Sequence, residues 1–100
     1  MKTRIRIESQ VEDFVKALAP VPRRRLRSAI KGLAGGRGNI KPLEGKLAGY
    51  SRLSVTGYRV IIHERFESGT RIIDCLFAER RAVVYEIFLH WLAEQTVHPD

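Results

Sequence analysis

Residues 51–77, SRLSVTGYRVIIHERFESGTRIIDCLF, decide the fold of this chain. They hold three runs rich in β-branched and aromatic residues, and two turn dipeptides, Thr56-Gly57 and Ser68-Gly69, separate these runs. Because such short turns join antiparallel neighbours, the stretch predicts three consecutive antiparallel strands. The second and third runs show little polar alternation, which is typical of strands covered on both faces. The predicted strands span residues 52–55, 58–65 and 72–77.

The chain before this stretch predicts a short strand and a helical hairpin. Arginine and isoleucine alternate near the amino terminus, as they do in a half-buried strand. Ser9 and Glu12 match a capping box, which predicts a helix over residues 10–19. A second helix is predicted to begin at Pro22 and to end at Gly35-Gly36, with arginines on its outer face.

Residues 35–49 carry Gly, Pro and Lys and predict a long connection. After the three strands, apolar residues recur at the spacing of one helix face. They are Val84, Ile87, Phe88, Trp91 and Leu92. Residues 95–100 are expected to form a flexible tail. The order β-α-α-β-β-β-α therefore predicts one α+β domain over residues 1–100, with helices packed on a mainly antiparallel four-stranded sheet.

The composition is that of a soluble globular protein, with 44% hydrophobic and 29% charged residues. No apolar run reaches the roughly 20 residues of a membrane span, and the amino terminus lacks the apolar core of a signal peptide. The single cysteine, Cys75, excludes an internal disulfide and predicts a cytoplasmic location, and its apolar neighbours predict an inert core residue. One cysteine and three scattered histidines provide no metal-ligand spacing, so neither a metal nor another cofactor is expected.

Positive charge is concentrated in the middle of the chain. The net charge is +7, and the segment from Arg23 to Arg59 holds ten basic residues against one acid, Glu44. Such a block predicts a polyanionic partner, either nucleic acid or an acidic protein, and the alternative is a solvated surface that keeps the domain soluble. The residues expected to hold RNA through its phosphates are Arg23, Arg24, Arg25, Arg27, Lys31, Lys41 and Lys46.

A two-residue turn at Thr56-Gly57 would determine which side chains of the first two hairpin strands share a face. It would set Ser54 opposite Arg59 and Arg52 opposite Ile61. The predicted polar face then carries Tyr50, Arg52, Ser54, Arg59 and His63. The predicted core face carries Leu53, Val55, Tyr58, Val60 and Ile62.

A second tight turn, at Ser68-Gly69, would set Ala78 opposite Arg59 and bring the Arg80-Arg81 corner within side-chain reach of it. Clustered arginines without nearby acids favour a bound anion, and guanidinium groups bind phosphate oxygens bidentately. Tyr85, one turn into the last helix, could orient or deprotonate a ribose 2′-hydroxyl or stack on a base.

Each of these residues also has a structural alternative. Arg80 and Arg81 could cover the helix start or pair with nearby acids, although cations there oppose the helix dipole. Tyr85 could be a half-buried aromatic beside the apolar stripe. For Tyr50 and His63, an ordinary edge aromatic and an exposed strand histidine are the favoured interpretation.

The stretch KPLEGKLAGYSRLSVTGYRVIIHERF, residues 41–66, followed by ERRAVVYEIF, residues 79–88, resembles the RelE/ParE superfamily of bacterial type II toxins. The motifs that carry the resemblance are Leu43-x-Gly45, Leu47-x-Gly49, Arg52-Leu53, Gly57-Tyr58-Arg59-Val60 and Arg81-x-x-Val84-Tyr85. With the preceding strand and helical hairpin, the resemblance covers nearly the whole chain. It implies a small sheet like that of microbial RNases, an acidic antitoxin that wraps the toxin, and a role in translation arrest.

RelE-type members cut messenger RNA in the ribosomal A site without a metal. The 2′-hydroxyl attacks the adjacent phosphate and leaves a cyclic phosphate and a 5′-hydroxyl. By position, the resemblance assigns Arg59 and Arg52 to phosphate and transition-state contacts. It assigns Arg81, with Arg80, to charge stabilisation or leaving-group protonation, and Tyr85 to positioning of the 2′-hydroxyl.

Two positions depart from the RelE pattern. Tyr50 and Arg52 stand where a lysine pair is usual, and Glu79 stands where the pattern has its leaving-group arginine. The expected function is a toxin acting as a metal-independent, ribosome-dependent endoribonuclease that arrests translation. The alternative is a ParE-like toxin without enzymatic activity that binds and inhibits DNA gyrase, and a third interpretation is a plain RNA-binding or inactive relative.

Overall fold

The structure is a computed structural model that describes residues 2–96. Its strands are β1 (Lys2–Ile7), β2 (Asn39–Pro42), β3 (Ser51–Val55), β4 (Tyr58–Glu67) and β5 (Thr70–Arg80). Its helices are α1 (Ser9–Lys16), α2 (Pro20–Gly32) and α3 (Val84–Thr96), with short 3-10 helices η1 (Leu33–Gly35) and η2 (Gly45–Leu47). Of the tail predicted over residues 95–100, residues 95 and 96 belong to α3, and residues 97–100 lie outside the described part of the chain.

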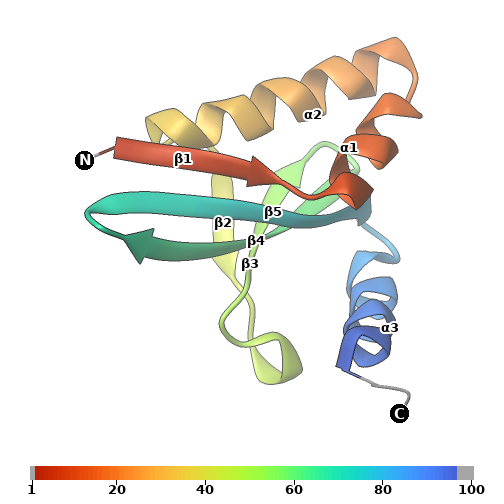
Figure 1. Ribbon diagram of the computed structural model, residues 1–100. Coiled ribbons are helices and arrows are strands. Elements are labelled where there is room, and N and C mark those ends of the chain that lie inside the picture. Colours follow the sequence, from red (N-terminus) through yellow and green to blue (C-terminus); the bar gives the residue numbers. More distant parts are fainter. Residues whose placement is uncertain (1, 97–100) are drawn as a thin grey trace.

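The strands form one sheet in the order β1-β5-β4-β3-β2 (Figure 1). β1 pairs parallel with β5, and every other pairing is antiparallel. The α+β class and the mainly antiparallel sheet are therefore confirmed, but the sheet has five strands and not four. The extra strand, β2, lies inside the segment predicted as a connection. It is an edge strand of four exposed residues that ends at Pro42, so it is short and has no buried face for a sequence pattern to reveal.

The sheet is covered on both faces, which explains why its inner strands lack alternation. α1 and α2 pack on one face, and α3 packs on the other, close to the end of β5 (Figure 1). The first core contains Val11, Val15, Leu26, Ile30, Leu33, Leu53, Val60, Ile62, Ile73, Cys75 and Ala78. The second core contains Leu47, Ile61, Phe77, Val84 and Phe88. Three successive residues of β4, numbers 60–62, are buried because they point alternately into the two cores.

The helical hairpin is present, with shifted ends. The predicted capping box is wrong, because the N-cap of α1 is Glu8 and no side chain caps the helix. α1 ends at Lys16 and not at residue 19. α2 begins at Pro20, two residues earlier than predicted, since a proline lacks only an N–H that the first turn of a helix does not need. Gly36, with a φ of 75°, ends the 3-10 extension of this helix in the left-handed conformation that glycine adopts at little cost.

The first hairpin has the predicted register. Val55 lies opposite Tyr58, and Ser54 lies opposite Arg59, on either side of the Thr56-Gly57 turn. All five residues predicted for the core face of this hairpin contact the first core. The turn dipeptide therefore determined the face of every side chain in β3 and in the first half of β4.

The second hairpin begins as predicted and then shifts by one residue. Glu67 lies opposite Thr70 across the Ser68-Gly69 turn, but a β-bulge in β5 leaves Leu76 without a partner. Beyond the bulge the pairing differs from the prediction. Arg59 was predicted to lie opposite Ala78, and it lies opposite Glu79. Leu76 sits in an uninterrupted apolar run, where an inserted residue leaves no mark on the sequence pattern.

Cys75 is fully buried in the first core, as the sequence predicted. Burial, together with the smaller effect of the nearby charge of Asp74, raises the pKa of its thiol to about 12. A raised pKa keeps the sulfur protonated at pH 8, and the thiolate is the reactive form. We therefore expect an aromatic disulfide reagent at pH 8 to label the protein only in a denaturing concentration of guanidinium chloride. The rate of labelling is measured by the absorbance of the thiolate that the reagent releases. Labelling of the native protein at the rate seen in denaturant would contradict the prediction.

Candidate functional site

The arginines of the first hairpin lie on the face of the sheet that α3 partly covers. Arg52 and Arg59 alternate with residues of the first core, and they share their face with Ile61, which belongs to the second core. Both arginines are half-buried. Because Arg59 lies opposite Ser54, two residues along β3 from Arg52, the two arginines are diagonal neighbours. This juxtaposition is the one that the sequence predicted.

Neither arginine is neutralised by a carboxylate. Arg52 Nη1 donates to Ser54 Oγ at 2.6 Å, and Arg59 Nη1 donates to the Tyr58 carbonyl at 2.8 Å. Within residues 2–96, neither guanidinium forms an ion pair. Most of the donors on these two side chains remain free for an anion.

The arginines of the second hairpin behave differently. Arg65 Nε lies 2.9 Å from Asp74 Oδ2, and Arg71 Nη2 lies 2.5 Å from Glu64 Oε2. The β4-β5 hairpin therefore pairs its arginines with acids near its own turn and leaves Arg59 unpaired at its other end. The unpaired end is the one next to α3, which makes it the candidate anion site.

The chain after β5 is fastened to the turn of the first hairpin. The Arg81 N–H donates to the Gly57 carbonyl at 2.9 Å, so Arg81 is held beside the Gly57-Tyr58-Arg59 motif while its side chain is exposed. The shifted register places Arg80 opposite Tyr58, a residue that contacts the first core. Arg80 therefore occupies a position on the face opposite to Arg59, and the predicted pair of arginines beside Arg59 is reduced to Arg81.

Glu79 is the acid that stands where an arginine was expected. The bulge makes it the direct cross-strand neighbour of Arg59, and it is half-buried. Glu79 Oε1 accepts a hydrogen bond from the Arg80 N–H at 2.9 Å and forms no ion pair with Arg59. A negative charge on the residue directly opposite Arg59 weakens the attraction of the site for anions.

Tyr85 lies in the first turn of α3 and is half-buried against the second core. The helix that carries it is held mainly by Phe88, whose ring lies 5.7 Å from Phe77 and stacks on Trp91 at 5.8 Å, between ring centroids. Its neighbour Val84 is fully buried. Tyr85 is thus placed on the arginine face by packing of the helix, and its partial burial fits both the catalytic and the structural interpretation.

Tyr50 and His63 contact each other on this face, with ring centroids 6.1 Å apart. Tyr50 also packs against Phe88 at 5.3 Å, edge to face. These contacts support the structural interpretation of both residues.

Over residues 2–96 no group of His, Cys, Asp and Glu is arranged to hold a metal ion. No helix in this part of the chain is long and apolar enough to cross a membrane.

The sequence predicted that the basic residues of α2 would form one outer face, but they lie on different sides of the helix. Arg24 and Arg25 line a cleft between α2 and the end of β3. Arg27 and Lys31 line a groove on the other flank of the helix, beside β1 and α1. The other residues expected to bind RNA are a half-buried Arg23 in α2, an exposed Lys41 in β2 and an exposed Lys46 in η2. The predicted RNA surface is therefore divided among separate regions.

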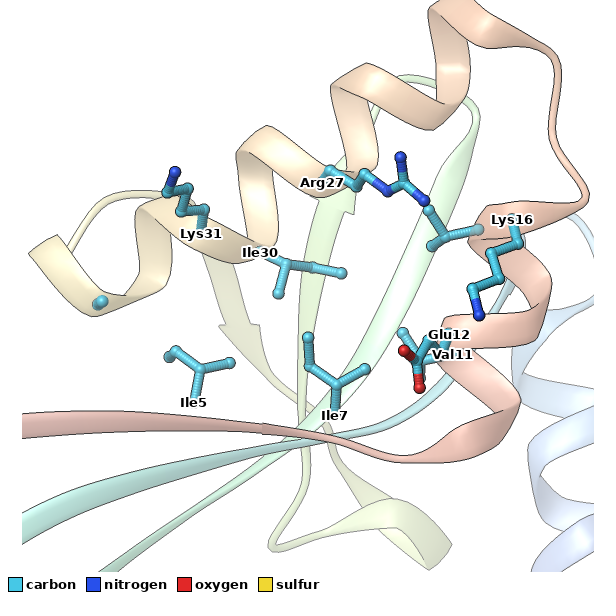
Figure 2. Close-up of a pocket in the computed structure, with 10 residues that line it drawn as sticks. Ile5, Ile7, Val11, Glu12, Lys16, Arg27, Ile30 and Lys31 are labelled. Carbon is cyan, nitrogen blue, oxygen red and sulfur yellow. The ribbon is translucent and has the colours of Figure 1, made fainter.

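No motif in the sequence predicted the groove beside β1. It has a volume of about 380 Å³ and an apolar floor made by two strand residues and three helix residues. The floor residues are Ile5, Ile7, Val11, Val15 and Ile30. Figure 2 shows Lys16, Arg27 and Lys31 around this floor, with Glu12 as the acid among them. Ile7 remains 48% exposed, which is the signal that the short amino-terminal strand has an uncovered apolar side.

No protein-family model and no curated protein matches this sequence. Among solved structures, the chain is similar to the YoeB/ParE toxin from Agrobacterium tumefaciens, with a TM-score of 0.55, 17% identity, and coverage of 81% of this chain and 99% of that one. The RelB-RelE antitoxin-toxin complex from Methanococcus jannaschii gives a TM-score of 0.58, 19% identity, and coverage of 83% and 98%. The toxin-antitoxin complex RelBE2 from Mycobacterium tuberculosis gives 0.55, 24%, and coverage of 82% and 94%. The chain therefore has the fold that these RelE and YoeB/ParE toxins share, as the motifs around Arg59 and Tyr85 predicted.

Proposed function

We propose that this chain is the toxin of a toxin-antitoxin pair and acts as a metal-independent, ribosome-dependent endoribonuclease in the cytoplasm. The observation that carries the proposal is the pair Arg52 and Arg59, which lie on one face without a carboxylate ion pair within residues 2–96. Arg81 is fastened beside them, and Tyr85 is presented by the helix that follows. This arrangement suits a phosphodiester with a ribose beside it.

The chemistry is an internal transesterification. The 2′-oxygen of the message forms a bond to the adjacent phosphorus, and the bond from phosphorus to the 5′-oxygen breaks. Arg52 and Arg59 stabilise the extra charge on the phosphoryl oxygens of the transition state. Tyr85 orients the 2′-hydroxyl, whose proton passes to solvent. Arg81 stabilises the departing 5′-oxygen by charge, because a guanidinium does not release its proton in a protein, and water supplies the proton.

A second candidate is a ParE-like toxin that inhibits DNA gyrase by binding it. Glu79 favours this alternative, because it lies opposite Arg59 at a place where a nuclease gains from positive charge. One of the similar solved structures is itself described as a YoeB/ParE toxin. The fold serves both candidates equally, so the decision rests on activity.

The deciding experiment adds the purified chain to a reconstituted translation reaction and maps the message by primer extension. We expect protein synthesis to stop and new 5′ ends to appear at codons in the ribosomal A site. A parallel reaction measures supercoiling of a relaxed plasmid by gyrase. An intact message together with inhibited supercoiling would refute the nuclease and establish the alternative.

The proposal includes an acidic antitoxin, and two of the similar structures are toxin-antitoxin complexes. The groove beside β1 has the chemistry for part of such a partner, since its apolar floor is surrounded by three cations and one acid (Figure 2). An amphipathic acidic segment would bury Ile7 and neutralise the surrounding cations.

Changing Ile7 to aspartate should therefore weaken antitoxin binding by about tenfold or more, because it places a charge where apolar surface must be buried. The partner to use is the short acidic protein of the adjacent reading frame, co-expressed and then titrated by calorimetry. Phe66→Asp is the matched control, since Phe66 is 59% exposed at the distant end of β4. Equal losses for both variants would show that the groove has no special part in the complex.

A further inference from the structure

The cleft on the other flank of α2 is a concave surface of a different kind. Its volume is about 500 Å³, and it lies between α2 and the strand end that precedes the first hairpin turn. The residues that line it are Arg24, Arg25, Ser28 and Ala29 from the helix, and Ser54, Val55 and Thr56 from the strand and turn. Among these residues, only the two arginines were predicted from the sequence to bind RNA.

The polar side chains of this cleft are suited to anions. Two arginines and three hydroxyl groups line it, and no carboxylate does. Neither Arg24 nor Arg25 forms an ion pair in the part of the chain that the structure describes. The groove on the opposite flank has an apolar floor instead, so the two flanks of one helix differ in the partner they fit. Paired guanidinium groups with hydroxyl donors are the usual protein ligands of phosphate oxygens.

The cleft joins the arginine face through Ser54. This residue lines the cleft, its Oγ accepts a hydrogen bond from Arg52 at 2.6 Å, and it lies directly opposite Arg59 in the sheet. The walls are rigid, because Leu26 of α2 and Leu53 of β3 are fully buried in the same core. Ser54 therefore connects the cleft to the arginine face, and no carboxylate lines the cleft itself.

We propose that this cleft binds the phosphodiester backbone of single-stranded RNA on one side of the phosphate held by Arg59. The inference rests on the proposed function, because it extends the same substrate along the protein surface. Arg24 and Arg25 neutralise backbone phosphates, and the hydroxyls of Ser28 and Thr56 donate hydrogen bonds to their oxygens. Contacts of this type read the backbone and not the bases, so the site is indifferent to sequence.

The test is an anisotropy titration with a fluorescein-labelled 2′-O-methyl oligouridine of about ten nucleotides, which resists cleavage and is long enough to occupy one such site. The double variant Arg24→Ala/Arg25→Ala should bind about tenfold more weakly than the wild type. Its salt dependence, as the slope of log K against log salt, should become shallower by about 1.4, or roughly 0.7 for each lost phosphate contact.

The matched control is Lys2→Ala/Arg4→Ala, which removes two exposed positive charges from β1, three strands away from β3 in the sheet. We expect this variant to keep its affinity to within about threefold, since exposed charges act only weakly beyond the screening distance. Equal losses in the two double variants would overturn the proposal in favour of general attraction by net charge. The proposal would also be overturned if the wild type showed no measurable binding of the oligouridine. The same holds if polyglutamate displaced the labelled oligouridine as effectively as unlabelled RNA does. Cleavage of the message is measured separately, so a nuclease that fails this test and an RNA-binding protein that does not cut are told apart.

Discussion

Arg59→Ala is expected to lower the rate of message cleavage by about 10² to 10³-fold, which is the usual effect of removing one preorganised donor from a charged transition state. Arg59 is half-buried on the α3 face and has no carboxylate ion pair within residues 2–96. Its charge is therefore not engaged in holding the fold together, and removing it should affect the reaction more than stability. The measurement is single-turnover cleavage of a message on stalled ribosomes, with unfolding by urea recorded in parallel.

Two further variants separate charge from geometry at this position. Arg59→Lys retains the positive charge but loses the planar fork, so it should recover only part of the lost rate. Arg71→Ala removes an arginine that is paired with Glu64 at the far end of the sheet, and it should cut at close to the wild-type rate. If Arg59→Ala cuts as fast as Arg71→Ala, the assignment of Arg59 to the transition state is wrong.

Phe88→Ala should lower the free energy of unfolding by about 3–5 kcal/mol, the cost of removing a buried phenyl ring from a packed core. Phe88 is fully buried, and its ring contacts Tyr50, Phe77 and Trp91. It is the centre of the second core, through which α3 is attached to the sheet. Unfolding by urea, followed by circular dichroism, measures the change directly.

Phe66→Ala is the control for this second prediction, because Phe66 is largely exposed and its truncation should change stability by no more than about 0.5 kcal/mol. The Phe88 variant should also lose cleavage activity at temperatures where it stays folded, since α3 positions Tyr85 on the arginine face. A variant that is destabilised but cuts normally would show that the packing of Phe88 is not what positions Tyr85 for the reaction.

The two cores lie on opposite faces of the sheet, and this separation has a functional consequence. The second core is small, with five buried residues, and the candidate site lies at its margin. The first core fastens α1 and α2 to the opposite face and shapes both flanks of α2. Substitutions in the first core should therefore alter the groove and the cleft, whereas those in the second core should alter the position of Tyr85.

Much of the fold could be predicted because its signals are local. The Thr56-Gly57 turn pairs two adjacent strands, and alternation then assigns each side chain to a face without any knowledge of the rest of the molecule. The same signal brought Arg52 and Arg59 together. The expected corner failed at Arg80 because one unpaired residue, Leu76, shifts the register of β5 between the turn and the corner.

By itself, the sequence determined the periodic elements, the register of the first hairpin and the excess of positive charge, because each depends on residues that are close together in the chain. Only the tertiary structure decided the pairing of β2, the placing of Glu79 opposite Arg59 and the division of the α2 cations between an apolar groove and a polar cleft. Those features arise where segments that are distant in the sequence meet. The partner that one side of a helix can bind depends on which elements lie beside it. The arginines of α2 are alike in sequence, and they differ because one flank faces Ile7 and the other faces Ser54.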